Sequence, residues 1–241
     1  MKALVFAAGL GTRLRPLTDN MPKALVPVRG VPMLERVIRK LQGAGFDSFV
    51  VNAHHFADMI VSFLKEKEGF GADVAVSLEE GEPLETGGGI RRAAPLLGKG
   101  RFFVHNVDIL SDLDVGWFLE KDVPGSLATL LLNDVEADRY LLFDNEMRLV
   151  GWANVKTGEV KSPYPDFNPS DYRRYSFCGI HVISDEVFSL MEPWPDRFSI
   201  IDFYLKVCRD HPIYGVVADN LQLIDIGSAE KLALAQESSL L

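Results

Sequence analysis

The chain has 241 residues, 47% of them hydrophobic, and is therefore long enough to bury a sizeable core. Its 25 Lys and Arg are outnumbered by 34 Asp and Glu, which gives a formal net charge of -9. This acidic balance argues against nucleic acid or an anionic membrane as a partner. Any anionic ligand must therefore be held by a local group of cations.

Export, membrane insertion and thiol chemistry are also disfavoured. The apolar run at 3–8 is too short for a secretory signal, and no stretch approaches the roughly 18 apolar residues of a membrane span. Cys178 and Cys208 lack the spacing of a metal or redox site, so we interpret them as small core residues. These features predict a cytoplasmic protein.

The first half alternates short apolar runs with helical patterns. Strands are predicted at 3–7, 48–52, 73–77 and 101–106, and helices within 32–46 and at 56–67 and 88–97. This alternation is typical of βαβ units. We therefore predict an α/β fold, a Rossmann-like doubly wound sheet with helices on both faces.

The pattern changes after residue 110, which predicts antiparallel strands and so a mixed sheet. Strands are predicted at 126–133, 139–144, 148–155, 176–183 and 212–226, and prolines in 161–175 predict an exposed loop. A helix should open at Ser199, with Asp202 completing a capping box. No repeat or linker divides the chain, so we expect one domain over 1–241, with halves meeting near residue 110.

A glycine turn and several cations follow the first predicted strand. Gly9 and Gly11 precede Thr12, Arg13 and, later, Lys23. Glycine lets backbone N–H groups converge on an anion, although a solvated basic loop is the alternative. The segment lacks the third glycine of G-x-G-x-x-G, and no G-x-x-x-x-G-K-[ST] occurs, which disfavours a nicotinamide-dependent oxidoreductase and the phosphate loop of nucleoside triphosphatases.

Two further segments carry candidate ligand-binding residues. Three glycines at 87–89, before an apolar helix, predict a loop shaped around a ligand, with a flexible turn as the alternative. Asp108 and Asp225 each follow a predicted strand, where aspartate is also common as a turn former or helix cap. Together the two carboxylates suit Mg²⁺, which prefers carboxylate, water and phosphate oxygens.

The segment "FAAGLGTRLRPLTDNMPKALVPVRGVP" resembles the sugar-1-phosphate nucleotidyltransferase family, and "LETGGGI", "FCGIHV" and "LIDIGS" follow in family order. The chain is most similar to the short bacterial N-acetylmuramate-1-phosphate uridylyltransferases. The resemblance implies that a sugar phosphate attacks the α-phosphorus of a nucleoside triphosphate and releases pyrophosphate. It also implies Mg²⁺ as the cofactor, with residues up to about 110 binding the nucleotide and those from about 111 the sugar phosphate.

The resemblance also implies a role for each matching residue. Arg13 should hold the β- and γ-phosphates, Lys23 should bridge the α-phosphate and the sugar phosphate, and Asp108 and Asp225 should hold Mg²⁺. Glu80 should meet the edge of the base. The nucleotide should further contact Ala7, Ala8, Gly9, Gly11, Thr12, Glu85, Thr86 and Gly87, and the sugar should contact Asn106, Asn154 and Gly179.

UTP and N-acetylmuramate 1-phosphate are the substrates that this resemblance favours. A guanylyltransferase acting on mannose 1-phosphate and a cytidylyltransferase acting on phosphocholine are the alternatives within the chemistry. The family usually has glycine where Val107 stands, and its F-x-E-K-P segment survives only loosely at 152–156. These departures motivate a third alternative, a non-catalytic module that binds nucleotide-sugars.

Overall fold

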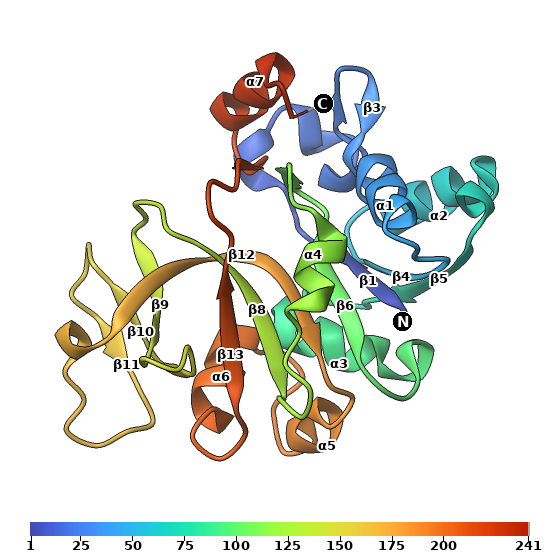
Figure 1. The fold of residues 1–241 in the computed structure, drawn as a ribbon. Helices are drawn as coiled ribbons and strands as arrows, with labels where there is room; N and C mark the ends of the chain where they lie inside the picture. Colours follow the sequence, from blue (N-terminus) through green and yellow to red (C-terminus); the bar gives the residue numbers. More distant parts are fainter. Residues whose placement is uncertain (241) are drawn as a thin grey trace.

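A computed structural model describes residues 1–240 of the chain (Figure 1). Its main sheet has ten strands, with the order β11-β10-β9-β12-β6-β1-β4-β5, and β8 joins β12 to β13. The strands are β1 Ala3–Phe6, β2 Pro27–Val28, β3 Val31–Pro32, β4 Ser48–Ala53, β5 Asp73–Leu78, β6 Phe102–Asn106, β7 Ile109–Ser111, β8 Ala128–Asn133, β9 Arg139–Phe143, β10 Leu149–Asn154, β11 Val160–Lys161, β12 Arg173–Ile183, β13 Ile213–Val217 and β14 Leu223–Asp225.

The helices follow the predicted alternation in the first half. They are α1 Met33–Gly43, α2 Ala57–Glu66, α3 Glu85–Leu97, α4 Val115–Glu120, α5 Val187–Met191, α6 Ile200–Val207 and α7 Ala229–Glu237. Short 3-10 helices are η1 Thr12–Leu14, η2 Leu17–Asp19, η3 Lys23–Leu25, η4 Glu68–Gly71 and η5 Pro169–Asp171. The predicted helix at 88–97 begins three residues earlier, at Glu85.

Parallel pairing of β1 with β4 and β6 forms the centre of the sheet. Val5 lies between Val51 on β4 and His105 on β6. All three strands run in the same direction, so their carboxyl ends meet at one edge, where ligands of open α/β sheets bind. This register places the segments that follow β1 and β6 side by side.

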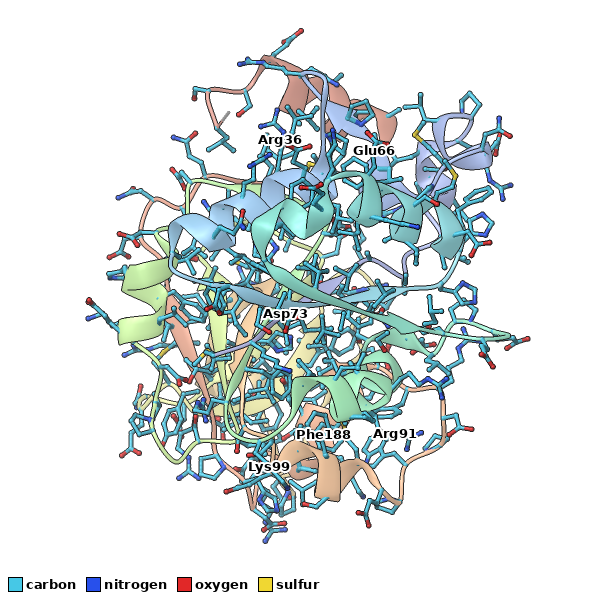
Figure 2. All side chains as sticks on the ribbon, turned by 90° about the vertical axis from the view of Figure 1, so that its right-hand side faces the viewer. Arg36, Glu66, Asp73, Arg91, Lys99 and Phe188 are labelled. Carbon is cyan, nitrogen blue, oxygen red and sulfur yellow. The ribbon has the colours of Figure 1, made fainter. Side chains whose placement is uncertain are left out.

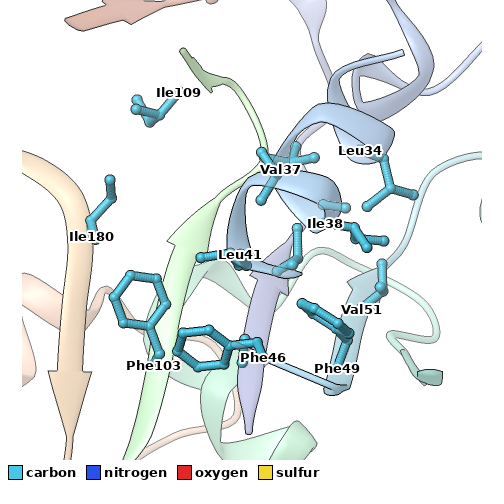
Figure 3. Close-up of a cluster of buried hydrophobic side chains, with 14 of the residues drawn as sticks. Leu34, Val37, Ile38, Leu41, Phe46, Phe49, Val51, Phe103, Ile109 and Ile180 are labelled. Atoms are coloured by element: carbon cyan, nitrogen blue, oxygen red, sulfur yellow. The ribbon is translucent and has the colours of Figure 1, made fainter. Parts of the chain in front are cut away.

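Helices cover both faces of the sheet, as predicted. Apolar side chains of α1, α2 and α4 pack on one face, and those of α3, α5 and α6 pack on the other. Figure 2 looks at the β5 edge, with Arg36 of α1 on one side of the sheet and Arg91 of α3 on the other. In α1, the spacing of Leu34, Ile38 and Leu41 places one apolar stripe in the buried cluster that also contains Phe46, Val51 and Phe103 (Figure 3).

Antiparallel strands extend the sheet in the second half, so the sheet is mixed, as predicted. The long strand β12 pairs with β6, β8 and β9, and β9 and β10 form an antiparallel pair. The expected single strand at 212–226 is wrong. Asn220 adopts a positive φ of 57° and turns the chain, so β13 stays in the main sheet whereas β14 pairs with β7.

The proline-rich loop is shorter than predicted, because β12 already begins at Arg173. Phe167 stacks on Tyr172 with ring centroids 4.7 Å apart, and its ring fills the space beside Gly151. The loop is thus tied to β10 by apolar packing. Among residues 1–240, no helix combines the length and apolar character needed to cross a bilayer.

Candidate active site

A cavity of about 410 Å³ opens where the carboxyl ends of β1 and β6 meet the start of α3. Of the predicted site residues, it is lined by Ala8, Gly9, Lys23, Glu85, Thr86, Asn106 and Asp108. Phe6, Leu10, Glu79, Pro83, Val107 and Ser199 complete the lining. Ala7, Gly11, Thr12 and Gly87 lie outside it. We call this space the first cavity.

The glycine turn after β1 is packed tightly against the segment that carries Lys23. Gly11 has a φ of 65°, and a Cβ there would lie 2.8 Å from Thr18 and 3.2 Å from Lys23. The Thr18 hydroxyl donates a hydrogen bond to the Gly11 carbonyl at 2.8 Å. Gly9, by contrast, has open space where its Cβ would be. The turn therefore leaves the backbone beside the cavity exposed to a ligand.

Lys23 lies between the two predicted metal-binding carboxylates. Its Nζ contacts Asp108 and is 4.0 Å from Oδ1 of Asp225. The carboxylates converge because Asp225 pairs with Ile109 in the β7–β14 ladder, and the Ile226 N–H donates to the Asp108 carbonyl. Two predicted residues more than a hundred positions apart are thus brought together by backbone pairing.

Burial raises the pKa of Asp225 above its ordinary value, and the charge of Asp108 adds to this effect. Lys23, Lys231 and Arg13 oppose the shift. A Cβ at Gly227 would lie 2.8 Å from the Arg13 guanidinium and 2.9 Å from Oδ1 of Asp225. Arg13 and Asp225 therefore approach each other beside Gly227, where a larger residue would displace one of the two side chains.

The two carboxylates suit a magnesium ion. Oδ1 of Asp225 is buried and has no hydrogen-bond partner in the described chain, so it is free to coordinate a cation. No group of three or more His, Cys, Asp or Glu in residues 1–240 could enclose a metal by itself. Mg²⁺ commonly takes one or two carboxylates and completes its shell with water and substrate phosphates, which fits this pair.

A second cavity of about 840 Å³ adjoins the first, and Ser199 lines both. Charged side chains from both halves face it. They include Arg13, Asp138, Arg139, Glu159, Lys161, Asp202 and Asp225, and Tyr140, Trp152, Asn154 and Phe177 are also part of the wall. Arg13 and Asp225 therefore face the second cavity, whereas Lys23 and Asp108 face the first.

The three residues predicted to contact the sugar have different surroundings. Gly179 has a φ of 71°, and a Cβ there would lie 2.4 Å from the Asn106 amide, so Gly179 makes room for Asn106. Asn154 faces the second cavity, but its Oδ1 accepts the N–H groups of Lys156 at 3.0 Å and Thr157 at 3.3 Å. Its side-chain oxygen is therefore committed to holding a turn.

The glycine triplet is not a loop, and that prediction is wrong. Gly87, Gly88 and Gly89 lie in the first two turns of α3 and are buried. A Cβ on Gly88 would lie 2.2 Å from the Asp196 carbonyl, and one on Gly87 would lie 2.4 Å from the Phe198 ring. The N–H groups of both glycines also point to the Phe198 carbonyl. The glycines thus let a segment of the second half dock directly on α3.

Ser199 lines both cavities, although the sequence analysis predicted it only as the N-cap of a helix. Its Oγ accepts the N–H of Ile201 at 3.2 Å, which confirms the predicted N-cap of α6. The second half of the predicted capping box is absent, because Asp202 pairs instead with Lys161 at 3.0 Å. The capping motif thus predicted where α6 begins, and in the structure this N-terminus lies at the junction of the two cavities.

The two glutamates that follow β5 face different surroundings. Glu80 is exposed and borders a separate hollow beside Arg91 and Arg92, so it lies outside the first cavity. Glu79 is only 6% exposed and lines the first cavity. The sequence prediction did not single out Glu79, because the family resemblance pointed to the adjacent Glu80.

Comparison with known proteins agrees with this geometry. Residues 2–138 match the nucleotidyl transferase family. The chain is 30% identical over 225 residues to the N-acetylmuramate alpha-1-phosphate uridylyltransferase of Caulobacter vibrioides, and this alignment covers 91% of the chain and 89% of the relative.

Solved structures are similar over nearly the whole chain. HddC from Yersinia pseudotuberculosis, crystallised with GMP-PN, superposes with a TM-score of 0.73 at 25% identity over 98% of both chains. A putative glucose-1-phosphate thymidylyltransferase from Bacillus anthracis reaches 0.79 at 21% identity, covering 98% of this chain and 94% of that one, and supports the fold alone. The sequence match and the site's geometry lead to one conclusion: this protein is an enzyme of the nucleotidyl transferase family.

Proposed function

We propose that the enzyme transfers the uridylyl group of UTP to N-acetylmuramate 1-phosphate and releases pyrophosphate. The observation that carries this proposal is the convergence of Lys23, Asp108 and Asp225 where two cavities meet. The first cavity would take the nucleotide and the second the sugar phosphate, so residues 1–110 and 111–241 would each supply most of one substrate site. The bond between the sugar phosphate and the α-phosphorus would form where the two cavities meet.

Little covalent work is required of the protein in this reaction, so positioning and charge neutralisation dominate. We assign Lys23 to the α-phosphate and the attacking sugar phosphate, because its Nζ lies at the cavity junction. Arg13 is assigned to the departing pyrophosphate, because its guanidinium approaches Asp225, one of the two carboxylates that would hold Mg²⁺. Bound Mg²⁺, held by Asp108 and Asp225, would neutralise triphosphate charge. These groups would stabilise charge that develops in the transition state.

Backbone and small side chains would contact the nucleoside. Ala8 and Gly9 face the first cavity, as do Glu85 and Thr86 at the start of α3. The Thr86 hydroxyl already accepts the Ile200 N–H at 3.0 Å, which fixes its position beside the cavity. Ala7, Gly11, Thr12 and Gly87 would then act as support for these groups, because they lie just behind the lining.

The choice of N-acetylmuramate 1-phosphate rests on the Caulobacter relative and on a cation in the second cavity. This sugar carries a lactyl carboxylate in addition to its phosphate. Arg139 faces the second cavity and forms no salt bridge within residues 1–240, whereas Lys161 is paired with Asp202 and Glu159. Arg139 is thus the side chain that we assign to the carboxylate. With these substrates, the enzyme would work in cytoplasmic cell-wall sugar metabolism.

The experiment that tests the proposal is a panel of UTP, GTP, CTP and ATP against N-acetylmuramate 1-phosphate, mannose 1-phosphate and phosphocholine, with Mg²⁺. Pyrophosphate release should be fastest with UTP and N-acetylmuramate 1-phosphate. Asp225→Asn should lower the rate by about a hundredfold and raise the Mg²⁺ concentration required, whereas Asp219→Asn, at an exposed position six residues earlier, should not.

A guanylyltransferase is the second candidate, because the similar HddC structure holds GMP-PN. Faster release with GTP and mannose 1-phosphate would establish that activity in place of the proposed one. Release of no pyrophosphate across the whole panel would leave the non-catalytic nucleotide-sugar module as the better account.

A further inference from the structure

Asp225 has a different lysine near each of its carboxylate oxygens. Its Oδ1 lies 4.0 Å from Nζ of Lys23, and its Oδ2 lies 3.8 Å from Nζ of Lys231. Lys23 belongs to the sequence motif that follows β1, whereas Lys231 comes three residues after the conserved-looking segment 223–228 and was not expected in the site. The tertiary structure thus adds a third cation, besides Lys23 and Arg13, to the surroundings of Asp225.

Helix α7 fixes the position from which Lys231 reaches Asp225. The Ser228 hydroxyl caps the helix by accepting the Lys231 N–H at 3.3 Å, so Lys231 lies in the first turn. Leu232, the next residue, packs in a buried cluster with Leu14, which follows Arg13 along the chain. The backbone at Lys231 is therefore held against the segment that carries Arg13.

The side chain of Lys231, in contrast to its backbone, is free to change partner. Half of it is exposed, and the distance of 3.8 Å to Asp225 is longer than a hydrogen bond. Within residues 1–240 it forms no other salt bridge. Exposed ion pairs of this kind contribute little to stability, so Lys231 can leave Asp225 at small cost.

Lys231 and Arg13 approach the same carboxylate. A Cβ at Gly227 would lie 2.8 Å from the Arg13 guanidinium and 2.9 Å from Oδ1 of Asp225, which shows how near Arg13 is to Asp225. A magnesium ion held by this carboxylate would compete with both cations for its oxygens. The triphosphate that accompanies the metal brings several negative charges, and its oxygens are strong acceptors for ammonium and guanidinium groups.

We propose that Lys231 binds the terminal phosphates of the nucleoside triphosphate, and the pyrophosphate released from it, in exchange for its contact with Asp225. This inference rests on the proposed function, because it takes Asp225 as a magnesium ligand and Arg13 as a pyrophosphate-binding residue. Lys23 would serve the α-phosphate, and Lys231 would act with Arg13 at the other end of the triphosphate. A nucleoside monophosphate lacks the groups that Lys231 would bind.

Isothermal titration calorimetry with UTP, UMP and pyrophosphate tests this assignment without an acceptor sugar. Mg²⁺ is kept saturating, so that a change in metal affinity at Asp225 does not contribute. Lys231→Gln should weaken the binding of UTP and of pyrophosphate about tenfold, because a hydrogen bond from a charged donor is lost. The affinity for UMP should stay unchanged, and Lys231→Arg, which keeps the charge, should restore most of the affinity for UTP.

Lys65→Gln is the matched control, because it removes the same charge from an exposed position on α2. It should leave all three affinities unchanged. Equal binding of UTP and pyrophosphate by Lys231→Gln and by the unaltered enzyme would overturn the proposal. An equal loss for UMP and UTP would also overturn it, since Lys231 would then act on the nucleoside or on Asp225 and not on the terminal phosphates.

The calorimetry separates this inference from the proposed function. Selective weakening of UTP and pyrophosphate in Lys231→Gln, without pyrophosphate release by the unaltered enzyme, would retain Lys231 as a phosphate-binding residue and reject the transfer reaction. Turnover of UTP together with unchanged binding in Lys231→Gln would do the reverse. Absence of binding of both UTP and pyrophosphate by the unaltered enzyme would reject both.

Discussion

The two cavities of the enzyme are built in different ways. The first is formed mainly by segments that follow parallel strands β1 and β6 and by the start of α3, and much of its wall is apolar side chain. The second is formed by antiparallel strands β9 and β10 with α6, and its wall carries many charges of both signs. A cavity with a largely apolar wall thus adjoins a more highly charged one, and the groups suited to chemistry lie at the boundary.

The difference indicates how the two substrates would be recognised. A nucleotide can be held by closely approaching backbone, because its phosphates and base present fixed hydrogen-bonding edges. An acceptor in the second cavity must compete with ion pairs that the protein makes for itself, such as Lys161 with Asp202. Recognition there should depend on the few side chains that remain unpaired.

The largest effect is expected at the boundary, from Lys23→Met. This change removes the cation between Asp108 and Asp225 and leaves the two carboxylates facing each other. We expect pyrophosphate release with UTP and N-acetylmuramate 1-phosphate to fall about a thousandfold, because charge neutralisation is the main catalytic contribution. Lys65→Met, an exposed change on α2, is the control. A residual rate above one tenth would contradict the assignment.

Gly88→Ala should disrupt the joint between the two halves. The added Cβ would lie 2.2 Å from the Asp196 carbonyl, and backbone cannot yield as a flexible side chain would. We expect the free energy of unfolding in urea to fall by about 2 kcal/mol. Gly43→Ala, where the added Cβ meets no atom within 4 Å, should be neutral or slightly stabilising. An equal change in the free energy of unfolding for the two variants would show that the contact between α3 and Asp196 tolerates an added Cβ.

Arg139→Ala should affect the second cavity alone. Loss of a charged hydrogen-bond donor should raise KM for N-acetylmuramate 1-phosphate about tenfold and leave KM for UTP unchanged. Arg173→Ala provides a comparison, because Arg173 lies on the neighbouring strand β12 and faces a different hollow. Initial rates at varied acceptor and varied UTP separate the two constants. A parallel rise in both would place Arg139 outside acceptor recognition.

The last prediction concerns pH and a fully enclosed histidine on β12, His181. Burial lowers the pKa of His181 from 6.5 to about 3, and its Nδ1 meets the Tyr204 hydroxyl at 2.9 Å. Below pH 6.5 His181 is protonated in the unfolded chain but stays neutral in the folded enzyme. The free energy of unfolding therefore falls as pH falls. Relative to His181→Gln, the enzyme should lose about 1.4 kcal/mol of unfolding free energy per pH unit between pH 6.5 and 4.

Urea titrations of both proteins at pH 7.5, 6 and 5 measure this difference. Above pH 7 the two stability curves should run parallel, since His181 is then neutral in both states. A constant gap between the two proteins across the acid range would mean that His181 accepts a proton in the folded enzyme.

The sequence by itself determined the alternation of strands and helices in the first half and the residue types of the cluster formed by Lys23, Asp108 and Asp225. Apolar periodicity is a local property, so the stripe of Leu34, Ile38 and Leu41 sufficed to predict α1. The motif around Arg13 and Lys23 likewise lies within one short segment. Such features depend on spacing along the chain and need no knowledge of distant residues.

Tertiary structure decided the features that depend on distant partners. The glycine triplet is helical because Asp196 and Phe198 pack against it, and no local signal distinguishes that arrangement from a loop. Asp225 meets Asp108 only through the pairing of β14 with β7. The presence of Glu79 rather than Glu80 in the wall of the first cavity follows from the direction in which β5 ends beside Asn52. None of these three features can be predicted without knowing which segments lie next to each other, because contacts between distant segments depend on the whole fold.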